Sequence, residues 1–152
     1  MDTQKYIKEK YSVPDDTVAM KLKGVLRQDL YVLFNELGFK LGAEVGVYRG
    51  ANAKVILDTV PNLKLHLVDL WQQRSFLRQT HKTLKRLKSR IVTVEKASMD
   101  AVRYYEDESL DFVYIDADHT FDFVMQDIIE WSKKVRPGGI VAGHDFLSLI
   151  HI

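Results

Sequence analysis

The chain has 152 residues, of which 46% are hydrophobic and 28% charged, a composition typical of one globular domain with a substantial core. It contains no cysteine, which excludes a disulfide framework and a thiolate metal site. The longest apolar runs, such as residues 30–34, are far too short to span a bilayer, and the polar start lacks the apolar core of a secretory signal. We therefore expect a cytoplasmic protein.

Before residue 41 the sequence predicts helices that pack on the main domain. Asp15 or Asp16 can cap a first helix, whose apolar positions would be Val18, Leu22, Val25 and Leu26. A second helix is expected to end at Gly38, with Leu30, Leu33, Phe34 and Leu37 on one face. We assign residues 1–40 to this helical segment, 41–146 to the core domain and 147–152 to a tail.

From residue 41 onward, segments typical of strands and helices alternate. Strands are predicted at residues 41–47, 63–69, 91–94, 110–115 and 140–142. The last helix is expected to end at residues 136–139 and to bury one stripe, made of Phe121, Val124, Met125, Ile128 and Ile129. Parallel neighbours need crossover connections, so this order predicts an α/β fold with a parallel sheet and helices on both faces.

The link between the first strand and its helix, Glu44-Val-Gly-Val-Tyr-Arg-Gly50, is the most informative segment. Its two glycines remove side chains where the backbone turns sharply and where a ligand approaches. The second strand ends at Asp69, about 20 residues after the turn, the spacing at which nucleotide-binding βαβ units place a carboxylate for ribose hydroxyls. The turn and the acid together predict a nucleotide site.

The segment between Trp71 and Val94 contains no acidic residue and seven basic ones. Such a run can bind nucleic acid or another anion. However, no aromatic residue interleaves with its later part to stack on bases. We favour a helix with a solvated basic face, which would bury Phe76, Leu77, Leu84 and Leu87 and expose Arg74, Arg78, Lys82, Lys85, Arg86, Lys88 and Arg90.

Five segments in order resemble the successive motifs of class I S-adenosylmethionine-dependent methyltransferases: residues 44–50, 67–69, 97–100, 114–119 and 137–145. The sequence is similar to a small bacterial group with ExGxxxG, DxDH and GGxxxGHD signatures, akin to catechol-type and macrolide-sugar O-methyltransferases. The resemblance implies a Rossmann-like, doubly wound parallel sheet with strand order 3-2-1-4-5. The usual strands 6 and 7 are expected to be lacking.

The resemblance also implies that the chain binds S-adenosyl-L-methionine. The glycine turn matches the part that holds the methionine moiety, and the helix start after it matches the site of the methionine carboxylate, where free N–H groups favour an anion. Asp69 matches the acid that takes both ribose hydroxyls, and residues 98 and 99 match neighbours of the adenine. The implied cofactor contacts are Glu44, Gly46, Tyr48, Gly50, Asn52, Asp69, Leu70, Ser98, Met99 and Asp116.

Methylation of a small hydroxylated molecule requires loss of the hydroxyl proton, and a histidine suits that task. His119 matches the base of related enzymes and follows Asp116 by three residues, so both are expected to face one pocket. We assign catalytic roles to these two residues. The alternative is that His119 only helps to start the next helix.

A divalent cation is the other element that metal-dependent relatives suggest. Carboxylate oxygens suit Mg²⁺ or Mn²⁺, and Asp116, His144 and Asp145 are the candidate ligands. The position before Asp145 departs from the relatives, because His144 stands where they often carry another acid. Asp118 is either a further ligand or a helix cap.

Two other functions remain open at this point. An NAD-dependent oxidoreductase shares the βαβ arrangement and the role of Asp69, but it expects the pattern GxGxxG, whereas the glycines here fall at 42, 46 and 50. A non-catalytic RNA-binding domain would use the basic helix, with binding that weakens steeply as salt rises. Nucleic acid is the less favoured partner.

The end of the chain raises a separate expectation. Residues 147–152 resemble the translation of a transposon-end sequencing adapter, so we expect the natural sequence to depart from this one near Phe146. The alternative is a genuine short protein that completes its sheet with another chain. In either case the fifth strand would be an unpaired sheet edge, which favours association of two copies.

Overall fold

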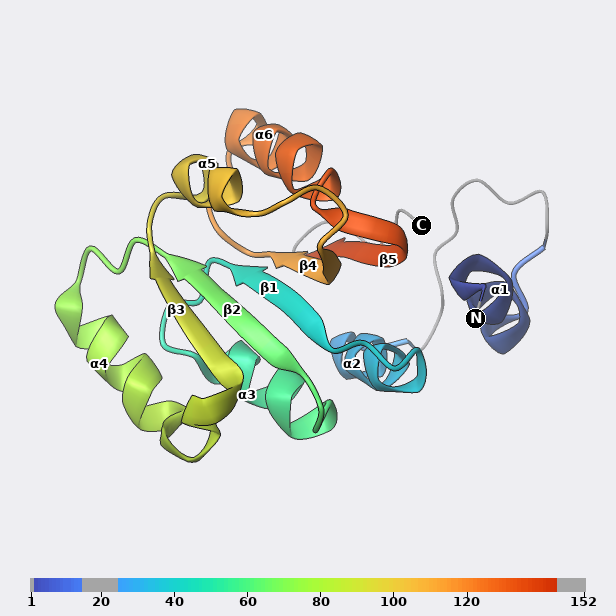
Figure 1. Cartoon of the computed structure of the whole chain (residues 1–152), viewed down its shortest axis with the longest axis horizontal. Coiled ribbons are helices and arrows are strands. Elements are labelled where there is room, and N and C mark those ends of the chain that lie inside the picture. The colour runs from blue at the N-terminus through green and yellow to red at the C-terminus, as the bar shows by residue number, and fades with distance from the viewer. Residues whose placement is uncertain (1, 15–24, 145–152) are drawn as a thin grey trace.

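The structure is a computed structural model that describes residues 2–14 and 25–144. A five-stranded parallel sheet lies at its centre (Figure 1). The order is β3-β2-β1-β4-β5, so the predicted α/β fold and strand order are confirmed. The strands are β1 (Leu41–Val45), β2 (Lys64–Asp69), β3 (Ile91–Glu95), β4 (Leu110–Ile115) and β5 (Val135–Gly143). Within the described residues no sixth or seventh strand follows, and β5 forms one edge of the sheet.

Helices cover both faces of the sheet (Figure 1). One layer contains α2 (Arg27–Glu36), α3 (Ala51–Thr59) and α4 (Arg74–Thr83), with α1 (Thr3–Tyr11) beside β5. The other layer contains α5 (Ser98–Ala101) and α6 (Phe121–Ser132), and short 3-10 turns cover Lys85–Arg90 and Val102–Tyr104. No helix in the described part of the chain is long and apolar enough to cross a membrane.

Each helical layer encloses its own hydrophobic core. The core under α2 and α3 contains a stack of Phe34 on Phe112, with ring centroids 4.1 Å apart. The core under α5 and α6 contains Val45, Val113 and Trp131. Alternate residues of the central strands therefore point to opposite cores, which explains why their sequences are largely apolar.

The strand register brings two carboxylates, those of Asp69 and Asp116, to the carboxyl ends of the strands. Val45 of β1 lies opposite Val68 of β2 on one side and Ile115 of β4 on the other. Asp69 and Asp116 are the next residues after those partners, so they flank the turn that follows β1. Ligands of parallel sheets bind beyond these carboxyl ends of the strands.

Two predictions for the N-terminal segment are resolved differently. The helix expected after Asp15 or Asp16 lies mostly outside the described residues, and its last members, Val25 and Leu26, precede α2 and are exposed. The second helix is confirmed as α2, and Gly38 follows it with a φ of +71°.

The strand boundaries differ in two places from those predicted. β1 ends at Val45 because Gly46 turns away with a φ of +89°. Residues 136–139, expected to be a helix stop, lie inside β5, and α6 ends earlier, at Ser132. A Cβ on Gly139 would lie 2.4 Å from the carbonyl oxygen of Asp111, so this glycine serves the close approach of β5 to β4.

The stripe predicted for α6 is partly wrong, because Phe121 and Ile129 are exposed. The inward stripe runs instead through Val124, Asp127, Ile128 and Trp131, which keeps helical spacing but includes an acid.

Asp111, near the start of β4, is half-buried. It accepts hydrogen bonds from the backbone N–H groups of Lys40 and Leu41 and from Arg136. Desolvation opposes ionisation, but these bonds outweigh it and lower the pKa of Asp111.

Candidate functional site

The turn after β1 is built around two glycines with positive φ. Gly46 donates a hydrogen bond to the carbonyl of Val68, and a Cβ there would lie 2.1 Å from the carbonyl oxygen of Asp116. Gly50 (φ +77°) begins α3 and supplies no side-chain cap. The turn is therefore pressed between β2 and β4, while the first N–H groups of α3 are left for another acceptor.

Asp69 holds this turn in place. One carboxylate oxygen accepts from the N–H groups of Val47 and Tyr48 at 2.9 and 2.8 Å, and the other accepts from the N–H of Trp71 at 2.7 Å. Glycine turn and acid thus meet, as the sequence predicts. An ionised carboxylate offers about four acceptor positions and three backbone donors already use it, and the contact with both ribose hydroxyls stays a prediction.

Tyr48 sits at the exposed tip of the turn with a positive φ of 55°. Its carbonyl accepts from the Trp71 indole N–H at 2.9 Å and from the Thr80 hydroxyl at 3.0 Å. Both donors are buried. Sequence reasoning missed Thr80, since a threonine inside a helix carries no obvious signal of such a role.

Glu44 is the least ordinary residue of the site. It lies on β1 with 1% of its surface exposed, and its Oε1 accepts from the Asn52 amide at 2.8 Å. Its Oε2 is buried and has no hydrogen-bond partner within the described structure. Burial, and to a lesser extent the nearby charges of Asp116 and Asp69, raise the pKa of Glu44 to about 8, although the Asn52 bond opposes the shift.

We predict that Glu44 makes stability depend on pH. The unfolded chain loses this proton near pH 4.5 and the folded chain near 8, so the folded state binds more protons in between. The free energy of unfolding should therefore fall as pH rises across that window, by up to about 1.4 kcal/mol per unit. Glu44→Gln should lose this dependence and be more stable than wild type at pH 8. Urea unfolding at pH 5 and 8 measures this difference, with Glu106→Gln as an exposed control. An equal change of unfolding free energy with pH in wild type and Glu44→Gln would contradict the prediction.

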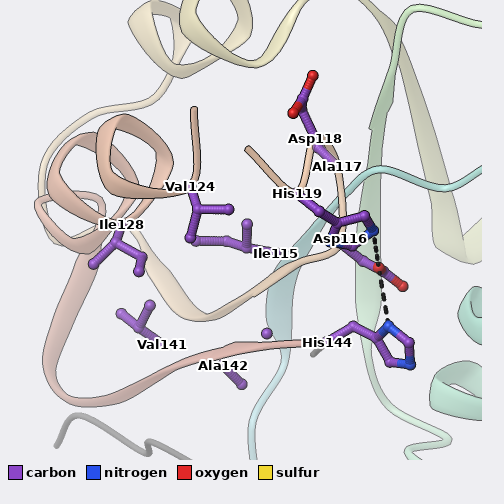
Figure 2. Close-up of a pocket in the computed structure, with 11 residues that line it drawn as sticks. Ile115, Asp116, Ala117, Asp118, His119, Val124, Ile128, Val141, Ala142 and His144 are labelled. Atoms are coloured by element: carbon purple, nitrogen blue, oxygen red, sulfur yellow. Dashed lines mark ion pairs between the residues drawn. The ribbon is translucent and has the colours of Figure 1, made fainter. Parts of the chain in front are cut away.

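A pocket of about 60 Å³ opens beyond the ends of β4 and β5, beside α6. Its apolar side is formed by Ile115, Val124, Ile128, Val141 and Ala142. Figure 2 shows these side chains on one side of the pocket and the polar groups on the other. Its volume is far too small for a nucleoside, so it can accept only a small molecule or part of one.

Asp116 lies between two histidines at the polar side of this pocket (Figure 2). Its Oδ1 is 3.5 Å from Nδ1 of His144 and 3.8 Å from Nε2 of His119. The structure thus brings together the two predicted catalytic residues and adds His144 to them. Asp118 points away from the apolar wall and accepts from the Thr120 N–H at 2.7 Å, so it holds the turn that leads into α6.

The metal prediction finds no support. No three His, Asp or Glu side chains in the described parts of the chain are arranged to hold a metal ion. Asp145, one of the three candidate ligands, lies outside the described residues.

The remaining predicted contacts surround the site unevenly. Leu70 follows Asp69 and is exposed, and Met99 packs partly against the second core. The Ser98 hydroxyl donates to the buried Asp127 and accepts from the Trp131 indole at 2.8 Å. The side chain of Ser98 therefore ties α5 to α6, and its role beside an adenine stays a prediction.

The basic helix behaves largely as the solvated-face interpretation expects. Leu77 and Leu84 are buried, while Phe76 and Leu87 pack partly against the same core. Arg74 pairs with Glu95. Arg90 departs from the interpretation, because it donates to the carbonyls of residues 57, 60 and 61 at the end of α3.

Residues 43–146 match the sequence profile of a methyltransferase domain family. The match covers more than half of the chain, and the chain therefore belongs to this methyltransferase domain family. A search of curated protein sequences finds no match.

Solved structures with the same fold are numerous. A Corynebacterium glutamicum protein aligns over 93% of this chain and 64% of its own, with a TM-score of 0.66 and 14% identity. A Staphylococcus aureus protein, provisionally assigned as a caffeoyl-CoA O-methyltransferase, aligns over 92% and 65%, with a TM-score of 0.64 and 13% identity. An O-methyltransferase family protein from Burkholderia thailandensis aligns over 75% and 35%, with a TM-score of 0.60 and 22% identity. These identities establish the fold alone, and the chain spans less than two thirds of the length of each protein.

Proposed function

We propose that this chain binds S-adenosylmethionine and methylates a hydroxyl group of a small molecule. The observation that carries the proposal is the buried, unpartnered carboxylate oxygen of Glu44 at the glycine turn, with the Asp69 and Asp116 carboxylates close enough to raise its pKa. Three acids around one turn make an anionic site, and such a site favours a cationic ligand. The family to which the chain belongs implies this cofactor, whose ammonium and sulfonium groups are both cationic.

The residues of the turn fit the cofactor by their chemistry. Glu44 would bind the ammonium group, and the uncapped N–H groups at the start of α3 would receive the methionine carboxylate. Asp69 has acceptor capacity for a ribose hydroxyl, and Leu70, Ser98 and Met99 are at the neighbouring strand ends. When bound, S-adenosylmethionine supplies an electrophilic methyl group on its sulfonium.

The pocket beside α6 supports the proposed acceptor site. Its apolar wall would exclude water and hold the body of the acceptor, and Asp116, His119 and His144 stand at its polar side. A neutral imidazole of His119 can take the hydroxyl proton on a ring nitrogen. The Asp116 carboxylate would then stabilise the imidazolium.

Calorimetric titration with S-adenosylhomocysteine tests cofactor binding, with NAD as the competing ligand. We expect saturable binding of S-adenosylhomocysteine and none of NAD. The glycine spacing supports this choice, because Gly42 lies within β1, where a Cβ would meet the Phe112 ring at 2.2 Å, and so serves packing rather than a dinucleotide turn. Binding of NAD alone would reverse the assignment.

His119→Ala should lower the methylation rate about 100-fold or more, the usual contribution of a general base, and leave S-adenosylhomocysteine affinity unchanged. The assay is release of S-adenosylhomocysteine from S-adenosylmethionine with acceptors found among small phenols and sugars. The control is His81→Ala, which removes an exposed histidine from α4. A His119→Ala enzyme as fast as wild type would leave His119 with a structural role.

A further inference from the structure

Two hydrogen bonds form a relay from α2 to Glu44. The Tyr31 hydroxyl of α2 donates to Asn52 Oδ1, and Asn52 Nδ2 donates to Glu44 Oε1 at 2.8 Å. Arg27, at the start of α2, lies near the hydroxyls of Tyr31 and Tyr114.

The hydrogen bond from Tyr31 fixes the orientation of the Asn52 amide. An asparagine side chain can present either its oxygen or its nitrogen to a neighbour, and the surrounding donors decide which. Because the Tyr31 hydroxyl donates to Oδ1, the NH₂ group must face Glu44. Without that hydroxyl the amide loses one of the two hydrogen bonds that hold it, so its orientation toward Glu44 is less well defined.

The position of Asn52 in turn decides what Glu44 offers to a ligand. With Oε1 held by the amide, Oε2 is the buried oxygen that stays unpartnered. Tyr31 is itself fully buried on α2, at a residue that precedes the family match at 43–146. Its ring packs against that of Tyr114, with 6.0 Å between the ring centroids, and this contact holds the Tyr31 hydroxyl in place.

We propose that Tyr31 is a positioning residue of the cofactor site: acting through Asn52, it directs the free oxygen of Glu44 to the ammonium group of the ligand. The helix α2 is then part of the binding site and not only a cover for the core. This inference rests on the proposed function and specifies which part of the cofactor α2 serves.

Two probes separate this role from a merely structural one. S-adenosylhomocysteine carries the amino-acid end, whereas 5′-methylthioadenosine has the same nucleoside without it. Tyr31→Phe should raise the dissociation constant for S-adenosylhomocysteine roughly fivefold, the usual cost of one hydrogen bond, and leave that for 5′-methylthioadenosine unchanged. The matched control is Tyr105→Phe, which removes a half-buried hydroxyl that contacts His66 at 3.0 Å and should alter neither constant.

Other outcomes are equally informative. The positioning role is overturned if Tyr31→Phe weakens the binding of both ligands equally, or if it weakens the binding of neither. Wild-type protein that binds neither ligand overturns the proposed function, and the relay with it.

A double-mutant cycle tests the route through Asn52. In an Asn52→Ala background, Tyr31→Phe should cause no further loss of S-adenosylhomocysteine affinity, whereas a full additional loss overturns the relay. If Tyr31→Phe does not fold, Asn52→Leu removes the amide that links Tyr31 to Glu44. Unchanged S-adenosylhomocysteine affinity in that variant also overturns it.

Discussion

Asp69→Ala is expected to weaken S-adenosylhomocysteine binding by at least about 100-fold. The carboxylate holds the glycine turn through the N–H groups of Val47 and Tyr48, and bonds of this charge-assisted kind contribute about 1.5 kcal/mol or more each. Loss of these two bonds alone removes roughly 3 kcal/mol of stabilisation from the bound form of the turn, which corresponds to about a hundredfold in the dissociation constant. The proposed ribose contact adds to this. Calorimetric titration measures the change.

Asp111→Ala provides the matched control. Asp111 is also a half-buried acid that accepts from two backbone N–H groups, those of Lys40 and Leu41. However, it lies near the amino end of β4, at the opposite end of the strands from the turn. Its loss should lower the melting temperature and leave ligand affinity intact. Similar affinity losses in both variants would mean that Asp69 acts through overall stability alone.

Much of the fold follows from the sequence because alternation of apolar strands with helices determines a parallel sheet. The second strand, its terminal Asp69 and the two glycines of the turn follow from local pattern and spacing, and the structure joins them as predicted. The prediction that a helix ends at residues 136–139 was wrong, although Pro and Gly usually end a helix. Here the Gly139 position is required by contact with Asp111, which no local pattern reveals.

The interior of the site was harder to predict, since its key contacts join residues far apart in the chain. Glu44 stands out in the sequence as an acid before a glycine turn, but its burial and unpartnered oxygen depend on packing from both neighbouring strands. Tyr31 lies in an apolar run and reads as core, and its hydroxyl gains significance only from the Asn52 partner 21 residues away. The motif around Ser98 likewise does not reveal that its hydroxyl bonds Asp127, and its role beside an adenine stays a prediction.

The second large effect expected is a release of protons when the cofactor binds. With a pKa of about 8, Glu44 is protonated in most empty molecules at pH 7. A bound ammonium group favours the carboxylate and lowers that pKa. Binding of S-adenosylhomocysteine at pH 7 should therefore release about 0.9 proton, and its dissociation constant should fall about tenfold from pH 6 to 7 before levelling above pH 8.

The charged and titratable groups around Glu44 make it the group that responds. On one side of Glu44 lie Arg27 and the hydroxyls of Tyr31 and Tyr114, and at the strand ends lie Asp69 and Asp116. Burial raises the pKa values of both tyrosines, which therefore stay neutral across this pH range. Calorimetry in buffers of different ionisation enthalpy counts the released protons. Glu44→Gln should release almost none and bind with little dependence on pH between 6 and 8. The ligand 5′-methylthioadenosine, which lacks the ammonium group, should behave in the same way toward wild-type protein, and a full proton released by it would place the titrating group elsewhere.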